Sequence, residues 1–191
     1  MPVCLFADGQ AVPEYARVLE PAIASGALPP LVLAGLHCDT TPDPWPDGRT
    51  REYLPGMDPD RFTVHLAFAV EEVLPTFDEV TYVINAGFSN GASFALAAAD
   101  RRPDLIAAAV ALSHQPAAAG VRIPRYLAAG TLEGGPGFRE CARWLASALA
   151  EAGIPHRHEE WVGGHDPYWW RVHLLAGLTW LVREALPEAH G

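Results

Sequence analysis

A serine between two glycines, at residues 87–91, limits what this chain can fold into more than any other feature. The segment Gly87-Phe-Ser-Asn-Gly91 follows an apolar stretch and precedes an alanine-rich one. This order predicts a strand, a sharp turn and a helix, with Ser89 at the tip of the turn. Glycine is needed at both positions because strand and helix would lie too close for a Cβ. Ser89 would then expose its hydroxyl near the positive end of the helix. The alternative is a glycine-rich loop whose serine caps the helix.

Apolar segments alternate with amphipathic ones along the rest of the chain. We predict strands at residues 3–7, 31–36, 82–86, 106–112, 122–129 and 156–161. Apolar residues at helical spacing predict helices over 15–23, 61–77, 92–99, 138–152 and 168–185. The stretch 37–61 is rich in Pro, Asp and Gly and is predicted to be irregular. Pro124 lies near the start of the predicted strand 122–129, where a proline is unfavourable inside a sheet. The connection 113–121 is short for a helical crossover, so a helix there would be reduced to a turn.

Strands that alternate with helices predict a parallel sheet with helices on both faces. We expect a single α/β domain over residues 1–191, a three-layer sandwich with about six mostly parallel strands. The net charge of −10 argues against nucleic acid and anionic membrane as partners. The start carries no signal-peptide pattern, and no apolar run reaches membrane-spanning length. The three cysteines are scattered, as is typical of reduced thiols. We therefore expect a cytoplasmic protein.

Functional residues of an open parallel sheet gather at the carboxyl edge. A serine, an acid and a histidine follow the predicted third, fifth and sixth strands, as Ser89, Glu133 and His165. This is the chain order of an α/β-hydrolase triad. Ser89 would be the nucleophile, His165 the base that takes its proton, and a carboxylate would fix the imidazole tautomer. The alternative for His165 is an ordinary loop histidine.

Two carboxylates compete for the role of the acid. Glu133 follows the fifth strand by a few residues, where the third member of a triad belongs, and Gly134 and Gly135 would let its turn bend toward His165. Asp166 is adjacent to His165, but neighbouring side chains on one loop usually diverge. We expect Asp166 to cap the final helix, with Pro167 in its first turn.

An oxyanion hole requires two backbone N–H donors near the nucleophile. We predict that Asn90 supplies one and Gln10, after the first strand, the other. The residues expected to line the substrate site are Gly9, His37, His114 and Trp169. For Arg49 and Arg51 we expect structural ion pairs with Asp39, Glu71 or Glu72. The alternative is that they bind a carboxylate or catecholate of the substrate.

No cofactor or metal is expected. His156 and His158, with His165 and Asp166, could suggest a metal site, but histidines that alternate on a strand are more often a solvated face. Cys38 lies beside His37 without a pattern that would lower the thiol pKa, so we expect it to line the pocket rather than to act as a nucleophile.

The chain resembles the esterase branch of the α/β-hydrolases that includes enterochelin esterases, feruloyl esterases, esterase D and the mycolyltransferases. The resemblance covers nearly the whole chain. Its motifs are Leu5-Phe-Ala-Asp-Gly-Gln10, Arg49-Thr-Arg-Glu-Tyr-Leu-Pro55, Glu72-Val-Leu-Pro75, Gly87-Phe-Ser-Asn-Gly91, Gly130-Thr-Leu-Glu133 and Gly163-Gly-His-Asp-Pro-Tyr-Trp-Trp-Arg171. It implies an α/β-hydrolase fold, Ser89 as nucleophile, His165 as base and a carboxylate in the turn that holds Glu133.

This sequence lacks two segments that members of the family usually have. Strands that usually precede the position of Val3 and an insertion after the fourth strand are missing, which implies a sheet of about six strands, no cap domain and an open, shallow site. The strand 31–36 would become an apolar sheet edge, so we expect a homodimer that covers it.

We expect a serine esterase that acts on small carboxylic esters through an acyl-enzyme on Ser89, with siderophore-type esters among the candidate substrates. One alternative is an acyltransferase of the same fold. The other is a catalytically silent hydrolase-like binding or scaffold protein, because fold alone does not guarantee chemistry.

Overall fold

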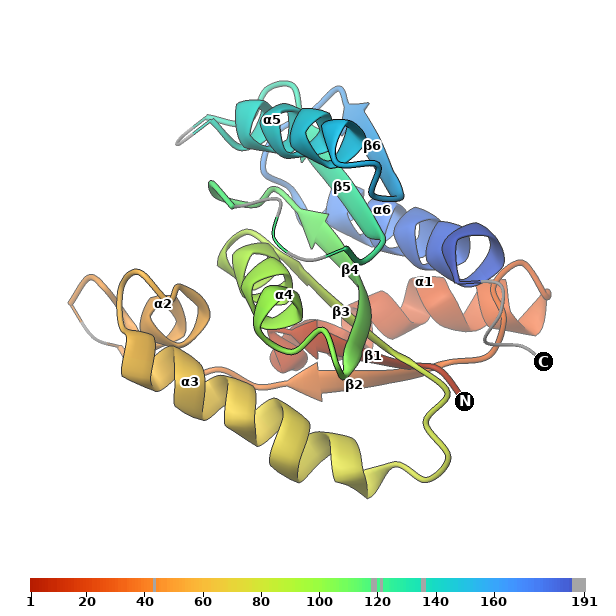
Figure 1. Ribbon diagram of the computed structural model, residues 1–191, viewed down its shortest axis with the longest axis horizontal. Helices are drawn as coiled ribbons and strands as arrows, with labels where there is room; N and C mark the ends of the chain where they lie inside the picture. Colours follow the sequence, from red (N-terminus) through yellow and green to blue (C-terminus); the bar gives the residue numbers. More distant parts are fainter. Residues whose placement is uncertain (43, 118–119, 121, 135–136, 187–191) are drawn as a thin grey trace.

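A computed structural model describes residues 1–42, 44–117, 120, 122–134 and 137–186. Its centre is a six-stranded sheet in which neighbours follow the order β2-β1-β3-β4-β5-β6, and every neighbouring pair is parallel (Figure 1). The strands are β1 (Val3–Ala7), β2 (Val32–Leu36), β3 (Val83–Phe88), β4 (Ile106–Leu112), β5 (Arg125–Gly130) and β6 (His156–Trp161). The sheet is therefore the parallel one that the alternating pattern predicts.

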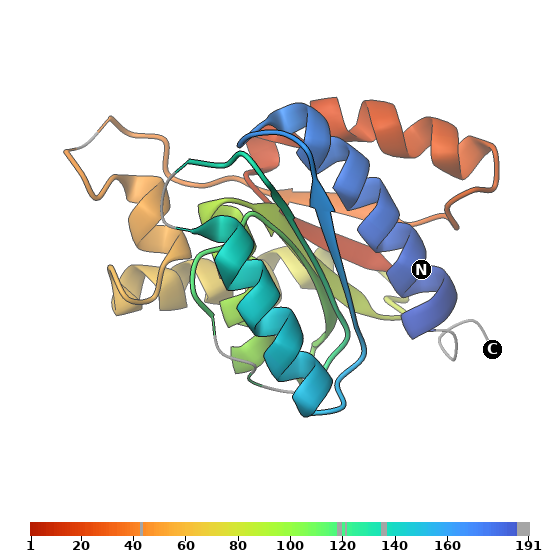
Figure 2. The same ribbon diagram turned by 90° about the horizontal axis from the view of Figure 1, so that it is seen from above.

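Helices cover both faces of this sheet. On one face, α1 (Val12–Ala24) lies beside α6 (Pro167–Trp180). The other face carries α4 (Asn90–Arg101) over β3 and β4, and α5 (Phe138–Glu151) over β5 and β6. Near α4, α2 (Gly48–Tyr53) packs with α3 (Pro59–Ala67). Figure 2, seen from above, shows the strands between the two helical layers.

Two apolar cores arise from the alternation of side chains along each strand. In β1, Val3 and Leu5 point into the core beneath α3, α4 and α5, whereas Cys4 and Phe6 point into the core beneath α1 and α6. All four are buried. Because both faces of the strands are covered, the sequence of β1 is apolar without interruption.

The structure corrects several predicted boundaries. The stretch predicted to be irregular contains α2, whose first turn is capped by Asp47, and α3 begins at Pro59 after the cap residue Asp58. The helix predicted over 61–77 ends at Ala67 and continues as a π-helical turn and a 3-10 turn. β5 begins at Arg125, because the proline before it cannot donate to a neighbouring strand. Among the described residues of the connection from β4 to β5, none is helical, as expected.

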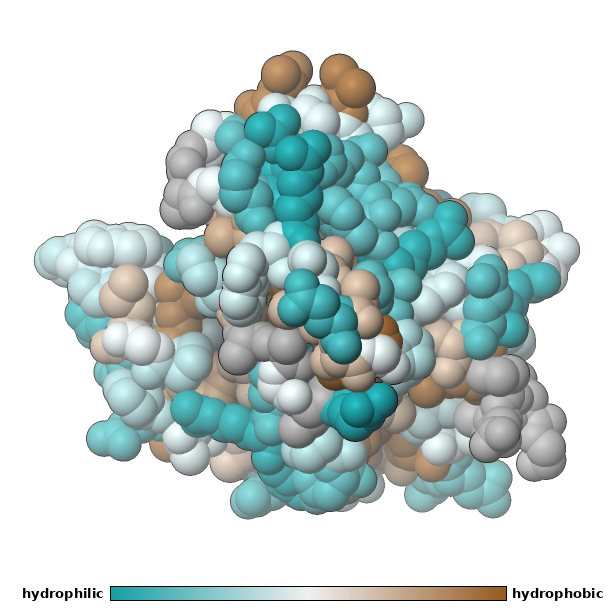
Figure 3. All heavy atoms as spheres, turned by 45° about the horizontal axis from the view of Figure 1, so that its top comes forward, coloured by the Kyte–Doolittle hydropathy of each residue, from teal (hydrophilic) through white to brown (hydrophobic). Residues whose placement is uncertain are grey.

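The face of the molecule that Figure 3 shows is mostly polar. On this face, apolar side chains form separate patches in hydrophilic surroundings, and the most prominent project at the top of the view. Large apolar side chains with more than half of their area exposed are Met1, Trp45, Val64, Leu132, Trp144, Val162 and Tyr168. Within the described part of the chain, no helix has the length and apolar character that a bilayer crossing requires.

Candidate active site

The turn from β3 to α4 holds Ser89 in a strained backbone conformation. Its φ of 56° and ψ of −127° lie in a region that L-residues rarely occupy. Two neighbours fix this conformation: the Ser89 N–H donates to the carbonyl of Leu112 at 2.8 Å, and the Ser89 carbonyl accepts from the Ala92 N–H at 3.0 Å. Ser89 is half-buried at the N-terminal end of α4. The turn thus has the strand-to-helix geometry predicted for it.

The two glycines of the turn are required by close packing. A Cβ on Gly87 would collide with the backbone of Gly91, and one on Gly91 would lie 2.9 Å from the Cβ of Ala7 and 3.0 Å from a carboxylate oxygen of Asp8. Strand β3, helix α4 and the end of β1 therefore meet without room for a side chain at either position.

His165 and Glu133 meet at the same edge of the sheet. The imidazole Nδ1 lies 3.2 Å from Glu133 Oε2. The Glu133 side chain is fully buried, while that of His165 is 32% exposed. Because Nδ1 faces the carboxylate, Nε2 is the nitrogen left to exchange a proton with a substrate or a nucleophile. Glu133, rather than Asp166, is thus the carboxylate in contact with the ring.

Two further donors hold the Glu133 carboxylate. Its Oε1 accepts from the Ser113 hydroxyl at 2.6 Å and from the Gly130 N–H at 2.9 Å. Ser113 is itself fully buried, has a φ of 57° and accepts from the indole N–H of Trp170 at 2.9 Å. The chain of hydrogen bonds from Trp170 through Ser113 to Glu133 therefore orients the acid from behind.

Trp170 connects the histidine to the turn that holds the serine. Its ring stacks on Phe88, the residue before Ser89, with centroids 4.4 Å apart. The His165 ring meets Trp170 edge-on at 4.6 Å and stacks on Phe138 at 4.8 Å. Among the hydrogen bonds of the described residues, none joins the Ser89 hydroxyl to His165. Such bonds are often long without substrate and tighten in the complex.

The predicted oxyanion donors lie at the start of two helical segments. Asn90 is the first residue of α4, so its N–H has no acceptor within the helix. Its side chain donates to the Thr50 hydroxyl at 3.2 Å and accepts from the amide of Gln115 at 2.8 Å. Gln10 lies in a 3-10 turn (Gly9–Ala11) directly after β1. Both donors thus lie just after the end of a strand, at the carboxyl edge of the sheet.

An ion pair supports the loop that carries Gln10. Asp8 is 2% exposed, with a φ of 62°, and its carboxylate accepts two bonds from the Arg49 guanidinium, at 2.6 Å and 2.7 Å. The Asp8 N–H donates to the Tyr53 hydroxyl at 2.7 Å. Arg49 therefore forms a structural ion pair as expected, but the predicted partners were wrong. Asp39 pairs with Arg61 instead, at 3.1 Å.

Two of the residues predicted to line the substrate site, His114 and Trp169, lie away from the ring of His165. His114 is fully buried and its Nδ1 lies 2.6 Å from the Gln115 carbonyl, so it is not on the surface that a substrate meets, which corrects the prediction. Burial also lowers the pKa of His114 to about 4. Trp169 is half-buried and stacks on Trp161 at 6.4 Å, away from the ring contacts of His165.

Gly9 and His37 lie together at the ends of β1 and β2. A Cβ on Gly9 would come within 2.8 Å of the His37 ring, and the His37 side chain is exposed. Cys38, beside it, is buried, and burial raises the pKa of its thiol, which disfavours a nucleophilic thiolate. The described residues contain no group of three or more His, Cys, Asp or Glu placed to hold a metal ion.

Sequence reasoning missed Ser113, Trp170 and the Arg49–Asp8 pair. Ser113 directly follows β4 and was visible as an edge residue, but nothing local indicates that its hydroxyl faces Glu133. Trp170 and Trp169 differ by one position on α6, and only the rotation of the helix decides which ring meets His165. Asp166 caps α6 as predicted, since it accepts from the Tyr168 N–H at 2.7 Å.

No family model and no curated protein matches this sequence. Solved structures match its fold, among them an enterobactin esterase from Shigella flexneri, solved in the presence of enterobactin. It aligns with a TM-score of 0.75 at 23% identity over 95% of this chain and 51% of its own. An IroE-like serine hydrolase from Shewanella oneidensis aligns with a TM-score of 0.75 at 15% identity over 95% of this chain and 70% of its own.

A ferulic acid esterase aligns with a TM-score of 0.69 at 18% identity, over 95% of this chain and 84% of its own. The chain thus spans about half the length of the enterobactin esterase and most of the ferulic acid esterase. At these identities the likeness establishes the fold, which is the α/β-hydrolase fold expected from the sequence.

Proposed function

We propose that this protein is a serine hydrolase that cleaves small carboxylic esters through an acyl-enzyme on Ser89. The observation that carries the proposal is the contact between His165 Nδ1 and the buried Glu133 carboxylate, at the sheet edge where Ser89 occupies its strained turn. A buried acid that holds an imidazole at the same sheet edge as a serine of this kind is consistent with a Ser-His-acid triad. The solved structures that share the fold and are named as esterases or a serine hydrolase support it.

In the proposed mechanism His165 Nε2 takes the proton of the Ser89 hydroxyl as Ser89 Oγ attacks the ester carbonyl carbon. The N–H groups of Asn90 and Gln10 bind the oxyanion of the tetrahedral intermediate. His165 then returns the proton to the alkoxide oxygen, and the alcohol leaves with the acyl group bonded to Ser89. Water then attacks the acyl carbon as the same nitrogen takes its proton, and His165 gives that proton to Ser89 Oγ as the acid leaves. Glu133 keeps the proton on Nδ1 throughout and stabilises the imidazolium.

A fluorophosphonate probe tests this assignment directly. We expect the probe to label the wild type and to leave Ser89→Ala unlabelled, and p-nitrophenyl acetate turnover to depend on Ser89 as well. Ser25→Ala is the control, because the Ser25 hydroxyl donates to the carbonyl of Ala22 at the end of α1, on the way back to the amino end of β2 and away from the carboxyl edge of the sheet. Equal labelling of the wild type and Ser89→Ala would contradict the proposal and favour a hydrolase-like binding protein.

Two neighbours are named as esterases of ferulic acid and of enterobactin, so we propose esters of the feruloyl or siderophore type as substrates to screen. Acyl transfer is the second outcome of the same chemistry, with an alcohol in place of water. Product analysis in the presence of a competing alcohol separates the two.

We also propose a homodimer across the free edge of β2. This strand is the last of the sheet on its side, it is half-buried, and it carries no charged residue to discourage pairing. Light scattering at micromolar concentration should give twice the chain mass. A strict monomer would contradict the dimer without affecting the esterase proposal.

A further inference from the structure

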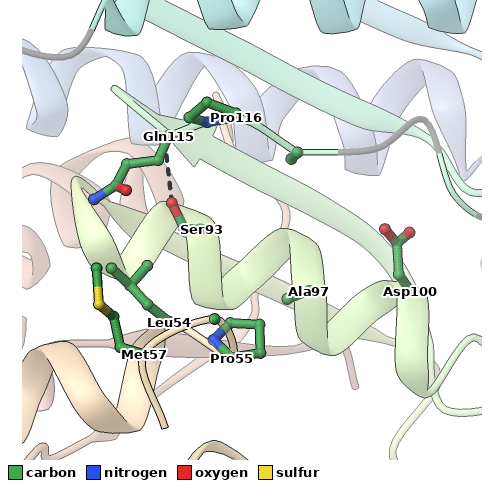
Figure 4. A pocket seen from close by; sticks show the side chains of 10 residues that line it. Leu54, Pro55, Met57, Ser93, Ala97, Asp100, Gln115 and Pro116 are labelled. Carbon is green, nitrogen blue, oxygen red and sulfur yellow. Dashed lines mark hydrogen bonds between the residues drawn. The ribbon is translucent and has the colours of Figure 1, made fainter. Parts of the chain in front are cut away.

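A cavity of about 400 Å³ runs along α4 and begins one helical turn after Ser89. Its floor is one face of α4, formed by Ser93, Ala97 and Asp100, which the helical repeat aligns. The N–H of Ser93 bonds the carbonyl of Ser89 at 3.3 Å, so the near end of the cavity lies one helical turn from the backbone of the proposed nucleophile. Figure 4 shows these side chains along the helix.

The walls of the cavity are mainly apolar. One wall is the segment after α2, with Leu54, Pro55 and Met57. The other is the segment after β4, with Pro116 and Ala117. Figure 4 shows the two segments on opposite sides of α4. Met57 is 48% exposed, and its flexible thioether can adapt to an apolar guest.

Polar groups stand at the two ends. At the near end, the Gln115 amide is bonded to the Asn90 side chain, and the Gln115 N–H donates to the Ser93 hydroxyl at 3.1 Å. At the far end lies the carboxylate of Asp100, which pairs with Arg125. The Arg125 side chain is fully buried, whereas that of Asp100 is 24% exposed. The carboxylate is therefore the charge that a guest in the cavity meets.

We propose that this cavity binds the acyl part of the ester and selects uncharged, apolar acyl groups. The inference rests on the proposed hydrolysis at Ser89. Apolar walls favour an alkyl or aryl group. The described lining offers no cation to an anionic group, because the Arg125 guanidinium is fully buried and paired with Asp100. The expected substrates are therefore esters with an uncharged alkyl or aryl acyl group.

The position of His165 indicates which part of the ester, acyl or alcohol, occupies the cavity. His165 must return a proton to the leaving oxygen, so the alcohol part has to lie on its side of the reacting carbon. The rings that border His165 belong to Phe138 and Trp170, and neither residue lines the cavity. The acyl part therefore extends the other way, along α4.

Filling the cavity tests the inference. For p-nitrophenyl acetate, butyrate, hexanoate and octanoate, kcat/KM of the wild type should rise by up to about fourfold per methylene until the cavity is full. Ala97→Phe places a ring on the α4 face of the cavity. Met57→Phe narrows the cavity from the segment after α2, at an exposed position that tolerates change. In both variants kcat/KM for hexanoate and octanoate should fall by about tenfold or more relative to acetate.

The matched control is Ala150→Phe, which adds the same ring to an exposed position of α5 outside the cavity. Its chain-length profile should equal that of the wild type. A half-ester of adipate should also react more slowly than its neutral methyl ester. Wild-type profiles in both Ala97→Phe and Met57→Phe would overturn the inference. The inference would also be overturned if the two variants changed kcat/KM with the length of the alcohol part, at a fixed acyl group, but not with the length of the acyl group.

A binding measurement separates this inference from the proposed function. N-butyl hexanamide should bind to Ser89→Ala in calorimetry, and Ala97→Phe in that background should abolish the binding. If the wild type shows no turnover dependent on Ser89 but this pattern holds, the proposed function fails and the cavity assignment stands. Equal binding with and without Ala97→Phe overturns the cavity assignment even if the esterase activity is present.

Discussion

Two carboxylates that adjoin the same histidine have different partners, and their substitution should have different effects. Glu133 contacts His165, whereas Asp166 caps α6. We expect Glu133→Gln to lower kcat by about 10²–10⁴-fold with the fold intact, because the amide no longer stabilises the imidazolium. Asp166→Asn should cost about 1 kcal/mol or less of unfolding free energy and leave kcat near the wild type. Steady-state kinetics and urea denaturation measure both, and the opposite pattern would make Asp166 the acid.

Ser113 positions the acid through its hydroxyl, at a backbone conformation that glycine adopts more readily. We expect Ser113→Gly to lower kcat by about tenfold, the effect of one lost hydrogen bond to a charged group, with KM unchanged.

Two comparisons distinguish positioning from a backbone role. Ser113→Cys keeps a weak donor and should restore part of the rate. Trp170→Phe keeps the ring contacts but removes the indole N–H, and should lower kcat less than Ser113→Gly does. A Ser113→Gly variant with wild-type kcat would mean that the hydroxyl does not act on Glu133.

At the scale of elements, the loop after β1 depends on α2. The carboxylate of Asp8, directly before the proposed oxyanion donor segment, is neutralised by Arg49 from α2. Arg49→Met leaves this carboxylate buried without a counter-ion. We therefore expect a loss of about 3 kcal/mol of unfolding free energy in urea denaturation, together with a lower kcat.

The control is Arg102→Met, which removes an exposed ion pair with Asp104. Exposed pairs contribute about 1 kcal/mol or less, so this variant should remain close to the wild type. The double variant Arg49→Met/Asp8→Asn should recover part of the loss, because the stranded charge is gone. Equal losses in Arg49→Met and Arg102→Met would show that the Asp8 pair has no special role.

At the scale of the whole molecule, buried histidines make stability depend on pH. His65 is 5% exposed among the rings of Tyr53, Phe68 and Phe94, and burial lowers its pKa to about 4 from 6.5. Between these two pKa values, His65 is protonated in the unfolded chain and neutral in the folded protein. The stabilising contribution is complete above pH 6.5 and is lost as the pH falls toward 4, by about 2 kcal/mol near pH 5.

His65→Phe should remove this part of the pH dependence. The phenyl ring suits the aromatic surroundings and leaves no unpaired Nε2, which is buried without a partner in the wild type. We expect the variant to lose less unfolding free energy between about pH 7 and about pH 5 than the wild type does. Urea denaturation at the two pH values measures the difference, and parallel losses would contradict the assignment to His65.

The sequence by itself determined the elements and their order. Alternation along strands, helical spacing and the paired glycines around Ser89 are local patterns, because each reflects steric limits within a few residues. For this reason β1, β4 and β6 have their predicted bounds, and Ser89, Glu133 and His165 were identified as edge residues before their geometry was known. Boundaries failed where caps and helix continuation compete, as after Ala67.

Only the tertiary structure decided which side chains meet. The partners Asp8 and Arg49 are 41 residues apart in the chain, and Trp170 and Ser113 are 57 apart. No local pattern encodes such contacts, because they depend on the rotation of each helix and the packing of loops from separate strands. The same reason explains why His114 is buried although its sequence position indicated the active edge, and why the cavity along α4 could not be foreseen. Local sterics set the elements, and the packing of distant segments set the site.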